Sequence, residues 1–185
     1  MRVVAGSARG RRLVAPTGAA TRPTSDRVRE AVFNSLGSQD SLDGALVVDL
    51  FAGTGALGIE ALSRGAEHAW FVERDRPALE ALQANLRATG LTDRADVAAV
   101  PVDRALATGG PLAGVVADLV LADPPYAFDG WAGLVAAVFD RWPGVLLVAE
   151  SDRPLDVGAD AGRLAASRRY GTTVVSFLRG PAEAE

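Results

Sequence analysis

Short apolar runs alternate along the chain with stretches whose apolar residues recur at helical spacing. The runs predict five buried strands, at residues 45–50, 69–72, 97–102, 118–122 and 145–149. Strands that are apolar at nearly every position are typical of parallel sheets covered on both faces. The helical spacing predicts helices between them, at residues 57–64, 78–89 and 131–140. This alternation predicts an α/β fold with a mainly parallel sheet.

Two further segments complete this predicted architecture. Residues 164–170 and 173–178, separated by Gly171, predict an antiparallel pair that brings the sheet to seven strands. At the other end, the apolar pairs at 3–4 and 13–14 flank a Gly/Arg turn and predict a β-hairpin, followed by a helix over 25–36. We therefore expect residues 1–37 to form an N-terminal extension and residues 38–180 to form the main domain.

Composition removes several kinds of chemistry. The chain has 185 residues, no cysteine, a single histidine, and 19 basic residues that are all arginine. Disulfides, cysteine nucleophiles, Schiff-base lysines and the lysine of a Walker A loop are therefore excluded, and we expect no metal site. No apolar run is long enough to cross a membrane, and no apolar signal segment follows Met1, so we expect a cytoplasmic protein.

Charge is distributed unevenly along the chain. Residues 1–36 contain seven arginines and two acids, for a net charge of +5, whereas the remaining residues carry a net charge of −9. A basic arm on an acidic body predicts an arm that contacts a polyanion, although a solvated basic face would give the same pattern.

A glycine-rich motif follows the first predicted strand, in the segment Asp49-Leu50-Phe51-Ala52-Gly53-Thr54-Gly55-Ala56-Leu57-Gly58. Glycines at this spacing permit a tight turn and a close ligand approach, and Glu73, at the end of the second strand, could accept both ribose hydroxyls. The pattern predicts a nucleoside-binding crevice, which a nicotinamide-dependent oxidoreductase would share. Asp49 favours S-adenosylmethionine, because an acid there would repel a pyrophosphate and suit a cationic ligand.

A second motif, Asp123-Pro124-Pro125-Tyr126, follows the fourth predicted strand. Consecutive prolines hold the backbone extended and remove two N–H donors, so the loop presents the Asp123 carboxylate and the Pro124 carbonyl as acceptors. An exocyclic amine needs two such acceptors before its lone pair can face an electrophile. Tyr126 offers a surface on which a base can stack. The motif therefore predicts transfer of a methyl group to an amine.

These motifs together resemble the class I S-adenosylmethionine-dependent amino-methyltransferases, which have a Rossmann-like fold. The Arg22-to-Glu30 segment (RPTSDRVRE), the basic hairpin before it and the stretch from Leu50 to Ala66 narrow the resemblance to the RsmD family. That resemblance implies methylation of a guanine N2 in 16S ribosomal RNA, the family's target being guanine-966. It covers about residues 1–180, and implies S-adenosylmethionine as methyl donor without a metal.

The resemblance and the motifs assign residues to three groups. We expect the cofactor to contact Asp49, Phe51, Ala52, Gly53, Thr54, Gly55, Gly58, Glu73, Asp103 and Asp123. We expect the catalytic residues to be Asp123, Pro124 and Tyr126. The candidate RNA contacts are Arg2, Arg9, Arg11, Arg12, Arg22 and Arg27.

Four residues, three on the predicted helix after the arm and one tryptophan, have two interpretations each. Arg27, Glu30 and Asn34 either order the Arg-Pro-Thr segment, which we favour, or touch the target nucleotide. Trp131 either packs in the core, which we favour, or walls the target pocket.

Three other functions stay open for the chain as a whole. They are an adenine-N6 nucleic-acid methyltransferase, a nicotinamide-dependent oxidoreductase, and a non-catalytic RNA-binding assembly factor. For the favoured function we expect a monomer whose partner is small-subunit ribosomal RNA, either naked or within a partly assembled 30S subunit.

Overall fold

The computed structural model describes residues 1–16, 26–37, 42–157 and 163–181. Within these residues, seven strands form one sheet in the order β3-β2-β1-β4-β5-β7-β6. The strands are β1 (Leu46–Leu50), β2 (His68–Val72), β3 (Ala95–Ala98), β4 (Leu119–Ala122), β5 (Leu146–Ser151), β6 (Arg163–Tyr170) and β7 (Thr173–Arg179). The strands β1 to β5 are parallel, and β7 runs antiparallel to both β5 and β6. The prediction of a seven-stranded, mainly parallel sheet is confirmed.

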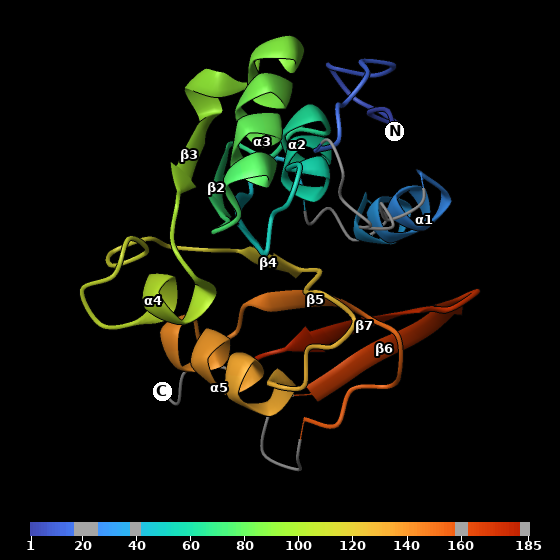
Figure 1. Cartoon of the computed structure of the whole chain (residues 1–185). Helices are drawn as coiled ribbons and strands as arrows, with labels where there is room; N and C mark the ends of the chain where they lie inside the picture. The colour runs from blue at the N-terminus through green and yellow to red at the C-terminus, as the bar shows by residue number, and fades with distance from the viewer. Residues whose placement is uncertain (17–25, 38–41, 158–162, 182–185) are drawn as a thin grey trace.

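Helices cover both faces of this sheet (Figure 1). They are α1 (Asp26–Gly37), α2 (Ala56–Ser63), α3 (Arg76–Thr89), α4 (Val102–Leu106) and α5 (Trp131–Arg141), with a single 3-10 turn at Thr92–Arg94. Apolar side chains of α1, α2 and α3 pack in one core, which also takes in Val3, Ala8 and Leu13 of the N-terminal arm. Those of α4 and α5 pack in a second core on the opposite face. The arm is therefore part of the folded structure.

The register of the central strands positions the crevice. Leu50, at the end of β1, pairs with Val72 of β2 and Ala122 of β4. The next residues of these strands, Phe51, Glu73 and Asp123, therefore emerge at the same edge of the sheet. From β1 the chain adds β2 and β3 on one side of the sheet, and then crosses to add β4 and β5 on the other side. Ligands of open α/β sheets bind at such a switch point, here between β1 and β4.

Two expectations about secondary structure are corrected. The predicted strand at 97–102 is displaced: β3 covers Ala95–Ala98, and Val102 begins α4. An edge strand needs no continuous apolar run, and Val100 and Val102 instead pack in the second core. The predicted N-terminal hairpin is reduced to one antiparallel bridge, between Arg2 and Arg12. Its remaining backbone groups bond across a turn-rich loop and to α2.

A buried ion pair ties the arm to α1 and α2. Glu60 of α2 is fully buried and accepts hydrogen bonds from the backbone amides of Val4 at 2.8 Å and Ala5 at 3.0 Å. Its carboxylate also lies 3.5 Å from the buried Arg29 of α1 and 2.7 Å from Arg64. Arg29 in turn donates to the carbonyl of Arg2. The charge of Arg29 thus serves the fold and is removed from the basic surface that the arm offers to a polyanion.

Replacing Glu60 with glutamine should lower the free energy of unfolding by about 3–5 kcal/mol, because it leaves the Arg29 charge buried without its carboxylate. Urea denaturation measures the change. The matched control is Glu80→Gln, which breaks an exposed pair with Arg76 and should cost less than about 1 kcal/mol. Equal losses in the two variants would show that the buried pair does not hold the arm.

Candidate active site

The glycine loop connects β1 to α2 through unusual backbone conformations. Gly53 and Gly55 have φ values of 55° and 78°, in the left-handed region that favours glycine. Gly55 is also the N-cap of α2, and a Cβ there would lie 2.2 Å from Leu82 Cδ1. Phe51 adopts a φ of 60°, a conformation that costs a non-glycine residue energy and is concentrated at functional sites.

The buried side chain of Asp49 in β1 holds this loop and the start of α2 in place. Its side chain is 1% exposed, and Oδ2 accepts a hydrogen bond from the Gly58 amide at 2.9 Å. Gly58 leaves no room for a side chain, because an added Cβ would lie 2.3 Å from Phe71 Cε1. The first turn of α2 can therefore approach the end of β1 closely.

Glu73, which directly follows the neighbouring strand β2, also holds the loop in place. Its Oε2 accepts from the Gly53 amide at 2.8 Å, and its Oε1 accepts from the amides of Arg74 and Asp75 at 2.7 and 2.8 Å. The carboxylate is thus held in one orientation beside the glycine loop. Oε1 thus already accepts two hydrogen bonds, whereas Oε2 accepts one and can accept another from a ligand hydroxyl.

Three carboxyl groups, those of Asp49, Glu73 and Asp123, lie at the crevice. Burial raises the pKa of the Asp49 carboxyl from 3.8 to about 7, against the opposing effect of the Gly58 hydrogen bond. The charges of Asp123 and Glu73 raise it further. Glu73 and Asp123, after the ends of β2 and β4, therefore lie close enough to disfavour ionisation of Asp49 in β1, and a cationic ligand would relieve that repulsion.

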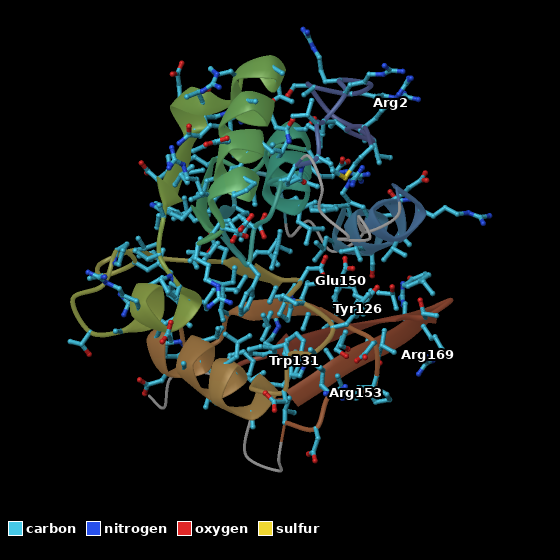
Figure 2. All side chains as sticks on the ribbon, viewed as in Figure 1. Arg2, Tyr126, Trp131, Glu150, Arg153 and Arg169 are labelled. Atoms are coloured by element: carbon cyan, nitrogen blue, oxygen red, sulfur yellow. The ribbon has the colours of Figure 1, made fainter. Side chains whose placement is uncertain are left out.

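The Asp-Pro-Pro-Tyr loop leaves β4 beside this crevice. Pro124 is buried, whereas Tyr126 is 46% exposed. The loop is closed by a hydrogen bond from the Phe128 amide to the Pro125 carbonyl at 2.8 Å. Figure 2 shows Tyr126 on the side of the molecule where α1 faces the β6–β7 hairpin. The exposed ring is available to a ligand.

Aromatic rings join the two loops. Phe128 makes edge-to-face contacts with Phe51 of the glycine loop and with Trp131 of α5, each with ring centroids 5.3 Å apart. Trp131 is buried, as the packing interpretation expects. Sequence reasoning missed Phe128, although a run of aromatic residues just after a catalytic loop could have drawn attention to it.

The remaining predicted residues lie at different places. Asp103 is exposed on the first turn of α4, and does not directly follow a strand as predicted. Arg2, Arg9, Arg11 and Arg12 are exposed on the arm, whose backbone contacts the last turn of α2 through Ser63. Arg27 is exposed on α1. Arg22 lies outside the described residues.

The described ranges offer neither a metal-binding cluster nor a membrane-spanning helix. There, no three His, Cys, Asp or Glu side chains gather in a way that could hold a metal ion. In the same ranges no helix has both the length and the apolar character to cross a membrane.

Comparison with known proteins identifies the family. A family model described as "Conserved hypothetical protein 95" matches residues 1–179. The "Putative rRNA methyltransferase YlbH" of Bacillus subtilis is 39% identical over 185 residues, covering 97% of this chain and 98% of that relative. The chain belongs to this family, the RsmD family of methyltransferases.

Further relatives and solved structures agree with this family and with its fold. The Escherichia coli "Ribosomal RNA small subunit methyltransferase D" is 46% identical over 86 residues, which cover 46% of this chain and 42% of that relative. The structure described as "Putative methyltransferase yhhF from Escherichia coli" superimposes with a TM-score of 0.83 at 33% identity and covers 99% of both chains. An RNA methyltransferase from Salinibacter ruber, in complex with S-adenosyl-L-homocysteine, shares the fold at 18% identity, with a TM-score of 0.68 over 89% of this chain and 97% of that one. The fold is that of the class I methyltransferases.

The raised pKa of Asp49 predicts a distinctive pH dependence of stability. Its carboxyl is ionised above pH 3.8 in the unfolded chain but stays protonated up to about pH 7 in the fold. Folding therefore takes up a proton between these values, and stability from this group falls by up to about 1.4 kcal/mol per pH unit as pH rises through the window. Above pH 7 the loss is complete.

Urea unfolding of the wild type and Asp49→Asn at pH 5, 6, 7 and 8 measures this effect. The amide cannot ionise but can still accept from Gly58, so the variant should lack the fall. If the free energy of unfolding changes with pH in the same way in both proteins, Asp49 is not held protonated in the folded state.

Proposed function

We propose that this chain transfers a methyl group from S-adenosylmethionine to the exocyclic N2 of a guanine in 16S ribosomal RNA, with guanine-966 as the target by family resemblance. The observation that carries the proposal is the convergence of Asp49, Glu73 and Asp123 at one edge of the sheet in an RsmD-family chain. Similarity to the small-subunit methyltransferase of E. coli supports an RNA substrate.

The anionic crevice favours S-adenosylmethionine over a nicotinamide dinucleotide. A pyrophosphate placed above Asp49 would meet three carboxyl groups, whereas a sulfonium and an ammonium would be attracted to them. The fold neighbour from S. ruber, which holds S-adenosylhomocysteine, is consistent with this choice. Glu73 would bind the ribose hydroxyls, the glycine loop would support the ligand, and Asp103 would lie near the adenine.

When bound, S-adenosylmethionine would supply an electrophilic methyl carbon on its sulfonium sulfur: the N2 lone pair bonds to that carbon as the carbon–sulfur bond breaks, and S-adenosylhomocysteine leaves as the neutral thioether. The methylated nitrogen then loses one proton, which the Asp123 carboxylate would accept. The chain positions the amine. The Asp123 carboxylate and the Pro124 carbonyl accept its two hydrogens, which turns the lone pair toward the crevice, while Tyr126 stacks on the base. The guanine must leave its stack to reach this loop.

Glu73→Ala should weaken the binding of S-adenosylhomocysteine roughly tenfold to a hundredfold, because charge-assisted hydrogen bonds are worth about 1.5–3 kcal/mol. Titration calorimetry gives the dissociation constant. Glu67→Ala, an exposed glutamate that precedes β2, is the control and should bind normally. An unchanged affinity in folded Glu73→Ala would take Glu73 out of the cofactor site.

Asp123→Ala should lower single-turnover methyl transfer by at least about two orders of magnitude, the usual loss for one preorganised polar contact. S-Adenosylhomocysteine affinity should change far less, because the variant chiefly loses the acceptor for the amine. Transfer of labelled methyl groups to undermethylated 30S subunits measures the rate. A wild-type rate in this variant would contradict the proposed mechanism.

Tyr126 provides a second test of the same loop. Tyr126→Ala should lose both rate and target affinity in the methyl-transfer assay, because the base loses its stacking surface. Tyr126→Phe keeps the ring and should behave almost like the wild type. Equal damage in the two variants would replace stacking with a role for the hydroxyl group.

The arm is proposed to contact phosphates through Arg2, Arg9, Arg11 and Arg12. Their replacement by glutamine tests this better than truncation, because Val3, Ala8 and Leu13 belong to the core. The slope of log affinity for RNA against log salt should shrink by roughly three units, at about 0.7–0.9 per contact. Filter binding at several salt concentrations measures it.

A double replacement of Arg87 and Arg179, both exposed on other elements, is the control and should leave the slope unchanged. If the arm variant also keeps the wild-type slope, its arginines form only a solvated face.

The proposal also includes the division of the chain into an N-terminal extension, residues 1–37, and a main domain, residues 38–180. It further includes a monomeric protein located in the cytoplasm.

A further inference from the structure

A cavity opens between α1 and the turn that joins β6 to β7. It has a volume of about 630 Å³ and is lined by Arg27, Val28, Glu30, Ala31, Asn34, Tyr170 and Gly171. This volume is within the range of about 300–1,000 Å³ that small-molecule sites occupy. The segments that line it are far apart in sequence, and no part of the glycine loop or the Asp-Pro-Pro-Tyr loop belongs to it.

The sheet register places this cavity at the catalytic edge. Ala122 of β4 pairs with Ala149 of β5, and Ser151, two residues later, pairs with Val174 of β7. Thr173, the residue before Val174 in β7, pairs with Tyr170 of β6. The β6–β7 turn therefore emerges beyond the same edge as the Asp-Pro-Pro-Tyr loop. The cavity therefore lies at the same end of the sheet as Tyr126.

The side chains that line the cavity suit a nucleotide. Tyr170 offers an aromatic ring, and the exposed Arg27 offers a guanidinium for a phosphate. Glu30 supplies a hydrogen-bond acceptor. Asn34 Oδ1 already accepts from Arg64 Nη1 at 3.2 Å, so the amide nitrogen of Asn34 remains as a donor for a base edge.

A second arginine lies on the same face of β6. Side chains alternate along a strand, so Arg168 shares a face with Tyr170, whereas Arg169 occupies the opposite face. Tyr170 and Ala166 pack against the core that contains α1, which shows that their common face is the α1 side. Figure 2 shows Arg169 directed away from α1. Arg168 is exposed and lies two residues from Tyr170 on the α1 side of β6, next to the cavity that Arg27 lines.

We propose that this cavity holds an unpaired nucleotide that neighbours the target guanine, with its base stacked on Tyr170 and its phosphates bound by Arg27 and Arg168. The proposal rests on the proposed function, because it assumes an RNA substrate. It gives the enzyme a second anchor, which keeps the RNA strand open while the target base lies in the catalytic loop. Recognition then depends on an unpaired neighbour as well as on the guanine.

Tyr170→Ala should raise the KM for undermethylated 30S subunits roughly 5- to 150-fold, the range that one lost stacking contact produces. The kcat and the affinity for S-adenosylhomocysteine should stay near wild-type values, which also shows that the variant is folded. Tyr170→Phe keeps the ring and should restore the KM. Labelled methyl transfer and calorimetry provide the three readouts.

The two neighbouring arginines give a matched pair. Arg168→Gln should raise KM, whereas Arg169→Gln, one residue along the same exposed strand, should not. Equal effects would indicate a diffuse basic surface and overturn the assignment. A wild-type KM in Tyr170→Ala would also overturn it.

RNA carrying an abasic site tests the contact directly. In a labelled 16S rRNA fragment around guanine-966, removing the base on one side of the target should weaken wild-type binding. The same change should cause no further loss in Tyr170→Ala, because the two groups act together. Additive losses for both neighbouring bases would contradict the stacked nucleotide.

These measurements separate two kinds of failure. If the wild type transfers no methyl group, the proposed function fails, yet the binding titrations with the RNA fragment still test the cavity. If methyl transfer is normal while the Tyr170 and Arg168 variants match the wild type, only the cavity assignment fails.

Discussion

The buried carboxyl of Asp49 accepts a hydrogen bond from the Gly58 amide, and this contact sets how closely α2 approaches the end of β1. The arrangement needs a residue without a side chain at position 58 and a polar group at the base of the crevice. Burying that polar group beside Glu73 and Asp123 raises its pKa to about 7. The residue that shapes the loop therefore also belongs to the group of carboxyls that favours a cationic cofactor.

The two halves of the candidate site are connected mechanically. Phe128 contacts Phe51 of the glycine loop and Trp131 of α5, and its backbone closes the Asp-Pro-Pro-Tyr loop. A shift in one loop is thus transmitted to the other through packed rings. Methyl transfer requires the donor and the amine to be aligned, so a rigid connection between their supports serves the chemistry.

The sequence predicted the features that depend on local pattern. Buried parallel strands are recognisable by their apolar runs, and the glycine and Asp-Pro-Pro-Tyr motifs occur directly after such strands, so the edge of the sheet that brings both motifs together could be located in advance. The displaced strand at 97–102 shows the limit of this reasoning. Val100 and Val102 pack against the core around α4 and α5 although they lie beyond the end of β3. An apolar run therefore indicates burial but does not distinguish a strand from a loop or helix that packs in a core.

Features that depend on distant contacts were not predictable in the same way. Arg29 read as part of a basic arm, but Glu60, 31 positions later, pairs with it in the interior. The cavity between α1 and Tyr170 joins segments from opposite ends of the chain. Neither pairing leaves a periodic or local signal, because each arises only when the sheet has assembled.

The most direct test of the account is the chemical identity of the methylated nucleoside. Undermethylated 30S subunits would be incubated with the protein and labelled S-adenosylmethionine, and the digested RNA analysed by chromatography and mass spectrometry. The account predicts one labelled N2-methylguanosine per subunit, at guanine-966. Label in N6-methyladenosine, or no label in RNA from a protein that binds S-adenosylhomocysteine, would contradict it.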